Sequence, residues 1–215
     1  MPRRTAQVTE ETRGLILAAA ETEFAAFGFA TARLADIAER VGITRAAVIY
    51  HFRDKQALYN AVLETAFEPL ADRIHAALTE PGSNAERIER VISAWFNYAA
   101  ERSALGRLFI REVASAEHAL RPEVERLTSP LYAAFLNTIE QGQRDGEFRA
   151  INALHVANIL SGATIWILSG AHLLGENQTE SRSERLDQYR DELIGVARYL
   201  LGIQPRDKEC ENSRE

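Results

Sequence analysis

Apolar residues recur at three- and four-residue steps along most of the chain, and no long stretch alternates apolar and polar residues. This period of about 3.6 residues is typical of helices with one buried face, whereas a half-buried strand alternates every second residue. Alanine is abundant and clusters of β-branched residues are rare, which also favours helices. The sequence therefore predicts an all-α fold, and 215 residues can bury a core without disulfides.

Glycine, proline and capping residues divide this pattern into segments. Helices are expected at about 9–28, 34–41, 44–52, 54–79, 85–101, 104–115, 122–144, 152–174 and 183–201. In the first helix Thr9 would be the N-cap and Gly28 the stop. Its buried stripe would comprise Ile16, Leu17, Ala20, Phe24 and Phe27. Residues 81–84 form a linker, and the charged segment 205–215 is expected to be disordered.

Two short helices joined by a glycine turn form the sharpest motif, at residues 34–52. Ala38 lies where the two helices would approach most closely, and Gly42 permits positive φ in the turn. Val48 and Phe52 would face inward. The outer face of the second helix would carry Thr44, Arg45, Ala47, Tyr50 and His51. This pattern predicts a helix-turn-helix that reads the major groove, although a helical hairpin without a DNA role has the same form.

Further blocks with a specific order and spacing surround this motif in residues 12–63. They are Thr12-Arg13-x-x-Ile16-Leu17-x-Ala19-Ala20, Phe24, Phe27-Gly28-Phe29, Ile37-Ala38-x-x-Val41-Gly42-Ile43-Thr44 and Tyr50-His51-Phe52-x-Asp54-Lys55-x-x-Leu58. This quarter of the chain resembles the TetR-like family of one-component transcriptional regulators. The resemblance implies a three-helix DNA-binding domain, here residues 1–54, and a larger helical effector-binding and dimerisation domain, residues 55–204.

The resemblance also implies which residues touch double-stranded DNA. The recognition helix would carry Thr44, Arg45, Ala46, Ala47, Tyr50 and His51. Lys55 stands where the family has a lysine that touches the DNA backbone, and phosphate contact would explain a cation that opposes the helix dipole. Arg3 and Arg4 either follow a phosphate backbone or belong to a solvated N-terminus.

Two departures from the family pattern affect individual DNA contacts. Ile49 occupies a slot where many members have a tyrosine whose hydroxyl reaches a phosphate. Ala32 and Arg33 replace a pair of threonines that cap the second helix. Thr31 would move the cap by one residue, and Arg33 would supply a charged phosphate contact. A helical dimeric adaptor with a weakened DNA-binding domain is therefore the alternative function.

Residues 150–175 contain no charged side chain and are long enough to span a bilayer, but histidines, asparagines and glycines within them disfavour a membrane helix. The family architecture implies instead a homodimer formed by the helices at about 152–174 and 183–201. The expected stripe of the last helix is Leu186, Tyr189, Leu193, Val196, Ala197 and Leu200. Two-fold symmetry would then match a near-palindromic operator. The apolar residues of these two helices would show the same spacing if they made only core contacts within a monomer.

Aromatic residues on the helices that line the family's cavity are the candidates for binding a small-molecule effector. They are Trp95, Phe96, Tyr98, Phe109, His118, Tyr132, Phe135 and Trp166. An aromatic stripe of this kind is also typical of plain core, and the lining suggests an apolar or aromatic effector. Glu64, Glu68, Asp72 and His75 share one helical face and would either bind a divalent metal or form a solvated acidic surface.

The net charge of −6 is unevenly distributed. Residues 1–60 hold eight Lys and Arg against seven Asp and Glu, a sum of +1, so the remainder carries −7. The potential of a DNA-binding face must then come from the placement of Arg3, Arg4, Arg33, Arg45 and Lys55.

Composition and motifs narrow the function classes further. Cys210 is the single cysteine, which excludes an intramolecular disulfide and fits a reducing cytoplasm, and the first residues lack the apolar core of a secretory signal. No hydrolase elbow, zinc-protease motif or phosphate-binding glycine loop is present. We therefore expect a cytoplasmic, non-enzymatic transcriptional regulator without a cofactor, acting as a repressor released by an effector.

Overall fold

The computed structural model describes residues 2–115, 120–170 and 181–203, with side chains from Thr9 onward. This part of the chain contains nine α-helices and no strand, which confirms the predicted fold class. The helices are α1 Pro2–Thr31, α2 Leu34–Val41, α3 Arg45–Phe52, α4 Lys55–Thr79, α5 Asn84–Glu101, α6 Leu105–Ser115, α7 Pro122–Arg144, α8 Ala153–Gly170 and α9 Arg182–Leu201.

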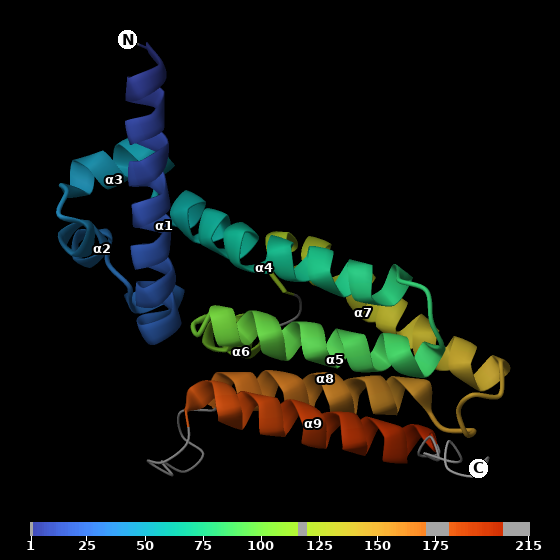
Figure 1. The fold of residues 1–215 in the computed structure, drawn as a ribbon. Coiled ribbons are helices and arrows are strands. Elements are labelled where there is room, and N and C mark those ends of the chain that lie inside the picture. The colour runs from blue at the N-terminus through green and yellow to red at the C-terminus, as the bar shows by residue number, and fades with distance from the viewer. Residues whose placement is uncertain (1, 116–119, 171–180, 204–215) are drawn as a thin grey trace, which may run out of the picture.

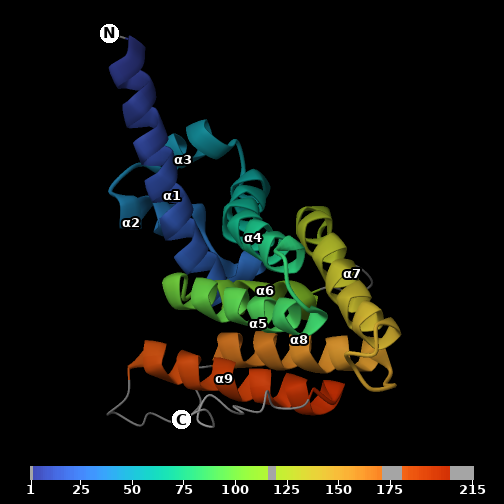
Figure 2. The ribbon, with the colours of Figure 1, turned by 45° about the vertical axis from the view of Figure 1, so that its right-hand side comes forward.

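The first three helices form a small unit beside a larger helical body (Figure 1). Helices α2 and α3 lie against α1, and α4 leads from this unit into the body, where it packs on α5 and α7. Helices α8 and α9 lie side by side at the edge of the body farthest from α2 and α3, as both views show (Figure 2). The helix-turn-helix and the α8–α9 edge are therefore at opposite ends of the molecule.

Local capping chemistry explains why the helix boundaries follow the sequence so closely. The Thr44 hydroxyl accepts a hydrogen bond from the Ala47 amide at 3.2 Å, and the Asp54 carboxylate accepts one from the Ala57 amide at 2.8 Å. Ser83 and Ser181 each form a capping box with the glutamate three residues later. Gly42 ends α2 in the left-handed conformation at φ 74°. These side chains satisfy helix-end groups that would otherwise lack partners.

The first helix differs from its prediction at both ends. It begins at Pro2, a residue favoured in the first helical turn, rather than at Thr9, and its first turns project beyond α3 (Figure 1). The predicted stop at Gly28 is a break with φ 75°, after which helix resumes to Thr31. Phe27, the last residue before the break, is 51% exposed rather than buried, whereas beyond the break Phe29 packs on Phe24 and Tyr59.

Two helices in the described part, Thr9–Thr31 and Ala153–Gly170, are long and apolar enough by length and composition to cross a membrane. Buried helices of soluble proteins meet the same criterion, so this is weak evidence for a membrane span. Helix α8 packs on α6, α7 and α9 and buries Val156, Leu160 and Leu168 among them. The uncharged sequence thus supplies core-facing residues of the helical body.

Close backbone approach between α6 and α8 depends on Gly106. A Cβ atom at this position would collide with the backbone carbonyl of Leu168 and the amide nitrogen of Ser169. Backbone atoms cannot move aside as the end of a flexible side chain can. The missing side chain therefore fixes how near these two helices can lie.

We expect Gly106→Ala to lower the free energy of unfolding by about 1–3 kcal/mol, because the added methyl overpacks the α6–α8 contact. Gly14→Ala is the matched control, since Gly14 is also helical and has no atom within 4 Å of its added Cβ. That control should be neutral or stabilise by up to about 1 kcal/mol. Urea unfolding followed by circular dichroism measures both. Equal effects of the two substitutions would contradict the steric explanation.

Candidate nucleic-acid interface and effector cavity

Helix α3 has an inner face that packs against the rest of the small unit and an outer face that is exposed to solvent. Val48 and Phe52 are buried, as predicted, and Tyr50 is 82% exposed on the opposite side. Arg45 and Ala46 are exposed, whereas Ala47 and His51 are half-buried. The turn before α3 is fixed by a backbone hydrogen bond of 3.0 Å from the Ile43 amide to the Ala38 carbonyl. The outer face thus carries a cation, hydroxyls and an imidazole on a rigid helix.

Four cations surround a shallow depression between the start of α2 and the turn from α3 to α4. The depression is lined in part by Arg33, Arg45, Arg53 and Lys55. In the described part of the chain, neither Arg33 nor Arg45 has an ion-pair partner, whereas Arg53 pairs with Asp54 at 3.0 Å. Clustered cations attract phosphate, so this surface suits a DNA backbone.

Arg53 was not among the predicted site residues. It lies at the C-terminal end of α3 with φ 57°, a conformation that a non-glycine residue rarely adopts. The signal in the sequence was a cation directly between two predicted helices. Its conformation, which turns the chain sharply at this point, has no sequence signature.

The Lys55 side chain is held by α1. Its Nζ donates a hydrogen bond to the Ala30 carbonyl at 3.0 Å and lies 4.9 Å from the centre of the Phe29 ring. Carbonyls near a helix C-terminus favour a cation. The end of α1 therefore supplies a partner for this lysine within the protein, in addition to the DNA phosphate that the sequence suggested.

The structure also places the residues that depart from the family pattern. Ile49 is half-buried and lines the depression, so no hydroxyl stands there. Arg33, not Thr31, is at the N-cap of α2, and it forms no side-chain cap. Thr31 belongs to the end of α1, so the predicted shift of the cap by one residue is wrong. The side chains of Arg3 and Arg4 lie outside the described part.

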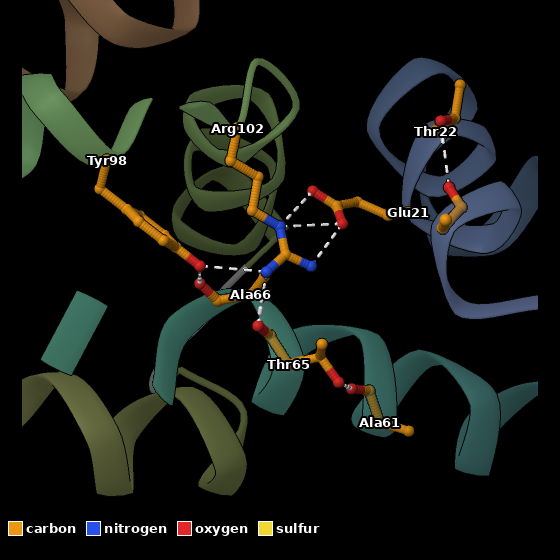
Figure 3. Close-up of polar contacts among 8 residues, drawn as sticks. Glu21, Thr22, Ala61, Thr65, Ala66, Tyr98 and Arg102 are labelled. Atoms are coloured by element: carbon orange, nitrogen blue, oxygen red, sulfur yellow. Dashed lines mark hydrogen bonds and ion pairs between the residues drawn. The ribbon is translucent and has the colours of Figure 1, made fainter. Parts of the chain in front are cut away.

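A guanidinium group joins the helix-turn-helix unit to the body (Figure 3). The Nε–H of Arg102 is shared between the two carboxylate oxygens of Glu21 on α1, at 2.8 and 2.9 Å, and its Nη1 donates to the Thr65 carbonyl on α4 at 2.6 Å. It also donates to the Tyr98 hydroxyl, which in turn donates to the Ala66 carbonyl. Burial by itself lowers the pKa of Arg102, but the bonds with Glu21 and Tyr98 outweigh it and hold the pKa above its ordinary value.

Helix α6 also binds α1, about one helical turn beyond Glu21. Arg111 donates hydrogen bonds to the carbonyls of Ala25 at 3.0 Å and Ala26 at 2.7 Å. The next residue, Glu112, is buried and accepts a short hydrogen bond from the Tyr59 hydroxyl. The carboxylate also pairs with Arg121 at 3.3 Å. Helix α6 therefore forms hydrogen bonds with both α1 and α4.

The ring of Tyr59 is part of this junction. Arg121 lies 4.9 Å from its centre and also stacks on Phe29. Burial raises the pKa of the Tyr59 hydroxyl, and the hydrogen bond to the Glu112 carboxylate raises it further. The neutral phenol is the form that this environment stabilises.

A cavity of about 280 Å³, partly open to solvent, lies between α4, α5, α6, α7 and α8 of the body. Four predicted aromatic residues line it: Trp95, Phe109, Tyr132 and Phe135. Sequence reasoning missed the residues that α4 and α8 contribute, among them Phe67, Leu70, Ile74, Leu160 and Thr164. Their helical spacing marks a buried face but does not distinguish cavity lining from closed core.

The remaining candidates lie elsewhere. Tyr98 and Phe96 are buried outside the lining, and the Tyr98 hydroxyl belongs to the Arg102 junction. Trp166 is 64% exposed, because it projects from the side of α8 that faces away from the body. His118 lies outside the described residues.

No group of three or more His, Cys, Asp or Glu in the described chain could hold a metal ion. Glu64, Glu68, Asp72 and His75 follow one another along α4, and Glu64 pairs with Arg126 at 3.4 Å. At a rise of about 1.5 Å per residue, their ends are too far apart for one ion.

An exposed helix-turn-helix face joined to a helical body with an internal apolar cavity defines the class of one-component transcriptional regulators. Residues 16–62 match the family model described as bacterial regulatory proteins, tetR family. Residues 81–169 match the model of the tetracyclin repressor-like C-terminal domain. The chain is a TetR-like regulator, which confirms the resemblance.

Relatives and solved structures agree with this assignment. TtgR of Pseudomonas putida is 46% identical over 68 residues, 32% of each chain, so the match spans about a third of that regulator. The repressor BepR of Brucella suis is 29% identical over 67% of this chain and 72% of its own. These relatives are transcriptional regulators, not enzymes.

Two solved structures share the fold. The ketosteroid regulator KstR2 of Mycobacterium tuberculosis has a TM-score of 0.72 at 19% identity, over 86% of this chain and 93% of its own. AibR, solved with isovaleryl coenzyme A and operator DNA, has a TM-score of 0.70 at 14% identity, over 86% and 97%.

The raised pKa of Tyr59 predicts a pH-dependent stability. The neutral phenol stabilises the fold below about pH 10, the ordinary tyrosine pKa, and this contribution falls by about 1 kcal/mol per pH unit above it. Tyr59→Phe should therefore lower the unfolding free energy at pH 8 by about 1–3 kcal/mol but lose less stability between pH 8 and 11. Urea unfolding at several pH values measures this, with the exposed Tyr50→Phe as control. Parallel pH profiles for wild type and Tyr59→Phe would contradict the assignment.

Proposed function

We propose that the protein is a dimeric DNA-binding repressor that a small-molecule effector releases from a near-palindromic operator in the cytoplasm. The observation that carries this proposal is the exposed face of α3 beside Arg33 and Arg45, which have no ion-pair partner among the described residues. The name of BepR supports repression, and the titles of AibR and KstR2 support a small-molecule ligand. We also propose residues 1–54 as the DNA-binding domain and 55–204 as the effector-binding and dimerisation domain.

Base contacts would come from the outer face of α3. Arg45 can donate two hydrogen bonds to guanine, and the methyl groups of Ala46 and Ala47 can pack on thymine. Thr44 has its oxygen engaged in the helix cap but keeps its hydroxyl proton to donate. Tyr50 and His51 would complete this surface. Their rings pack edge to face, with centres 5.5 Å apart, which restrains both.

Phosphate contacts would come from the cations around the depression. Arg33 and Arg53 are exposed there. Lys55 donates one of its three ammonium protons to Ala30, which leaves two for a phosphate. Such contacts hold the protein in register without reading sequence.

Dimerisation through α8 and α9 is supported by apolar side chains that the protomer leaves exposed. Ile159 and Trp166 lie on the outer side of α8, and Val196 and Tyr199 on that of α9, with Tyr199 78% exposed. Gly162 has open space around it, so a partner helix can approach closely. The stripe predicted for α9 needs correction, because most of it faces the core of the protomer. Leu186, Leu193 and Ala197 are buried there.

Helix α6 is placed to couple the effector cavity to the DNA-binding unit. Phe109 lines the cavity, and Arg111, two residues later, binds the carbonyls of α1. An effector that favours one position of α6 would shift α1 and the recognition helix with it. Its influence is limited to the difference in its affinity for the two arrangements.

We expect Arg45→Ala to reduce discrimination between operator and unrelated DNA by about 1–3 kcal/mol, because a base contact is lost. Lys55→Ala should weaken binding to all sequences alike, since it removes a phosphate contact. The operator is first selected from randomised DNA, and fluorescence anisotropy then measures both affinities. Arg144→Ala, an exposed arginine on α7, is the control. Equal effects of Arg45→Ala and Lys55→Ala on every DNA would refute this division, and a dimer without DNA affinity at low salt would favour the adaptor.

We expect the double substitution Val196→Glu and Tyr199→Glu to give monomers, because four carboxylates would be buried across a two-fold interface. Sedimentation velocity measures the oligomeric state, and operator affinity should fall at least about tenfold with the loss of the second half-site contact. Val113→Glu is the control, since Val113 is an exposed apolar residue on α6. A double variant that stays dimeric would exclude this interface.

A further inference from the structure

The described lining of the cavity contains no charged side chain. Its walls are aliphatic and aromatic, with a few hydroxyl groups from Thr128, Ser129, Ser161 and Thr164. A ligand carboxylate or phosphate held between these walls would lose part of its hydration without gaining a cationic partner from the described lining. Burying an unpaired charge is costly, so the lining selects against charged ligands.

Half of the polar side chains in the lining already donate a hydrogen bond within the protein. The hydroxyls of Thr128 and Thr164 donate to carbonyls of their own helices at 2.9 and 2.8 Å. The Tyr132 hydroxyl donates to the Asn158 side chain at 2.6 Å. The groups left to donate a proton to a ligand are the two serine hydroxyls and the Trp95 indole. The lining can therefore donate hydrogen bonds to one small polar group of a ligand, but it has too few free donors for a ligand with many polar groups.

One wall of the cavity is aromatic. The Phe109 ring contacts Phe67 with centres 5.4 Å apart and Trp95 with centres 5.7 Å apart, the latter edge to face. Phe135 adds another ring to the lining. Rings that meet at such angles offer both faces and edges to a further ring, an arrangement that favours aromatic ligands.

The volume limits the size of the ligand. An apolar protein cavity of about 150 Å³ holds one benzene molecule. The cavity here, at about 280 Å³, is close to twice that size. It matches two fused aromatic rings with at most one small substituent.

From these observations we propose that the effector is an uncharged aromatic molecule of about two fused rings with one neutral hydrogen-bonding group. This inference rests on the proposed function in that it assigns the chemical class of the effector. The binding step itself can be measured without DNA.

The test compares 2-naphthol, neutral at pH 7, with 2-naphthoate, an anion of similar shape. Isothermal titration calorimetry on the full chain should give a Kd for 2-naphthol at least about tenfold lower than for 2-naphthoate. The chain has two tryptophans, so Trp166→Phe leaves Trp95 as the single tryptophan, which can be excited selectively over tyrosine at about 295 nm. Binding of 2-naphthol should then change the Trp95 emission.

A charge introduced into the lining should reverse the preference. Ser161→Lys places an ammonium group in the cavity and should shift the ratio of the two Kd values toward 2-naphthoate by at least about tenfold. Asn97→Lys is the matched control, because it adds the same charge on the exposed side of α5 and should leave the ratio unchanged. Circular dichroism establishes that both variants fold.

Three outcomes would overturn the proposal: tighter binding of 2-naphthoate than of 2-naphthol to the wild type, binding of a coenzyme A thioester with neither naphthalene bound, or an unchanged ratio in folded Ser161→Lys. Operator binding by the wild type without any probe is measured in parallel. Operator binding with no 2-naphthol binding would reject the effector class and leave the regulator intact. Binding of 2-naphthol with no DNA binding would reject the proposed function alone.

Discussion

The ion pair between Arg102 and Glu21 is the interaction on which the arrangement of the two parts depends. Arg102 sits at the C-terminal end of α5, yet its guanidinium bonds to a carboxylate of α1 and a carbonyl of α4. One planar group with donors in fixed directions thus sets the positions of three helices. Removal of either partner would leave the other charge partly buried without compensation, which is costly.

The contact between the DNA-binding unit and the body includes several hydrogen bonds, and these limit how the two parts can move relative to one another. Arg102 and Arg111 bind α1 through directional hydrogen bonds, several of them to backbone carbonyls. Such bonds depend on direction and weaken steeply when their geometry is lost, so they favour defined positions of α1. A junction of this kind suits two discrete arrangements of the DNA-binding unit, as the proposed release by an effector would require.

The parts of the fold that local chemistry determines could be predicted from the sequence. Thr44, Asp54 and Ser83 each accept a hydrogen bond from the backbone amide three residues later. Because such a cap involves only neighbouring residues, the sequence indicates it without knowledge of the rest of the fold. Positions that depend on distant packing were harder. Phe27 shares the periodicity of the buried face of α1, but the break at Gly28 turns the chain so that Phe29 takes the place in the core.

The residues of the candidate sites also fall into two groups: those that local sequence predicts and those that depend on packing between distant segments. The two faces of α3 follow from helical spacing alone, since Val48 and Phe52 are the apolar residues of that short helix that lie four positions apart. The partner of Lys55 is the end of another helix, 25 residues away, and no local pattern indicates it. Trp166 has the composition of a pocket residue, but only the packing of α8 shows that it faces outward. The same reason explains why Leu186, Leu193 and Ala197 of α9 were assigned to a dimer although the protomer buries them.

The distribution of ion pairs explains how an acidic protein can present a basic face. Several arginines of the body pair with nearby carboxylates, among them Arg73 with Glu101 at 2.7 Å and Arg198 with Glu89 at 2.7 Å. A paired arginine contributes little to the potential at a distance, because the two charges cancel. Arg33 and Arg45 have no such partner within the described residues, so their field extends into solvent. The net charge of −7 beyond residue 60 then repels DNA from the body. Attraction at one end and repulsion over the rest would orient the molecule with α3 toward the duplex, as the proposed interface requires.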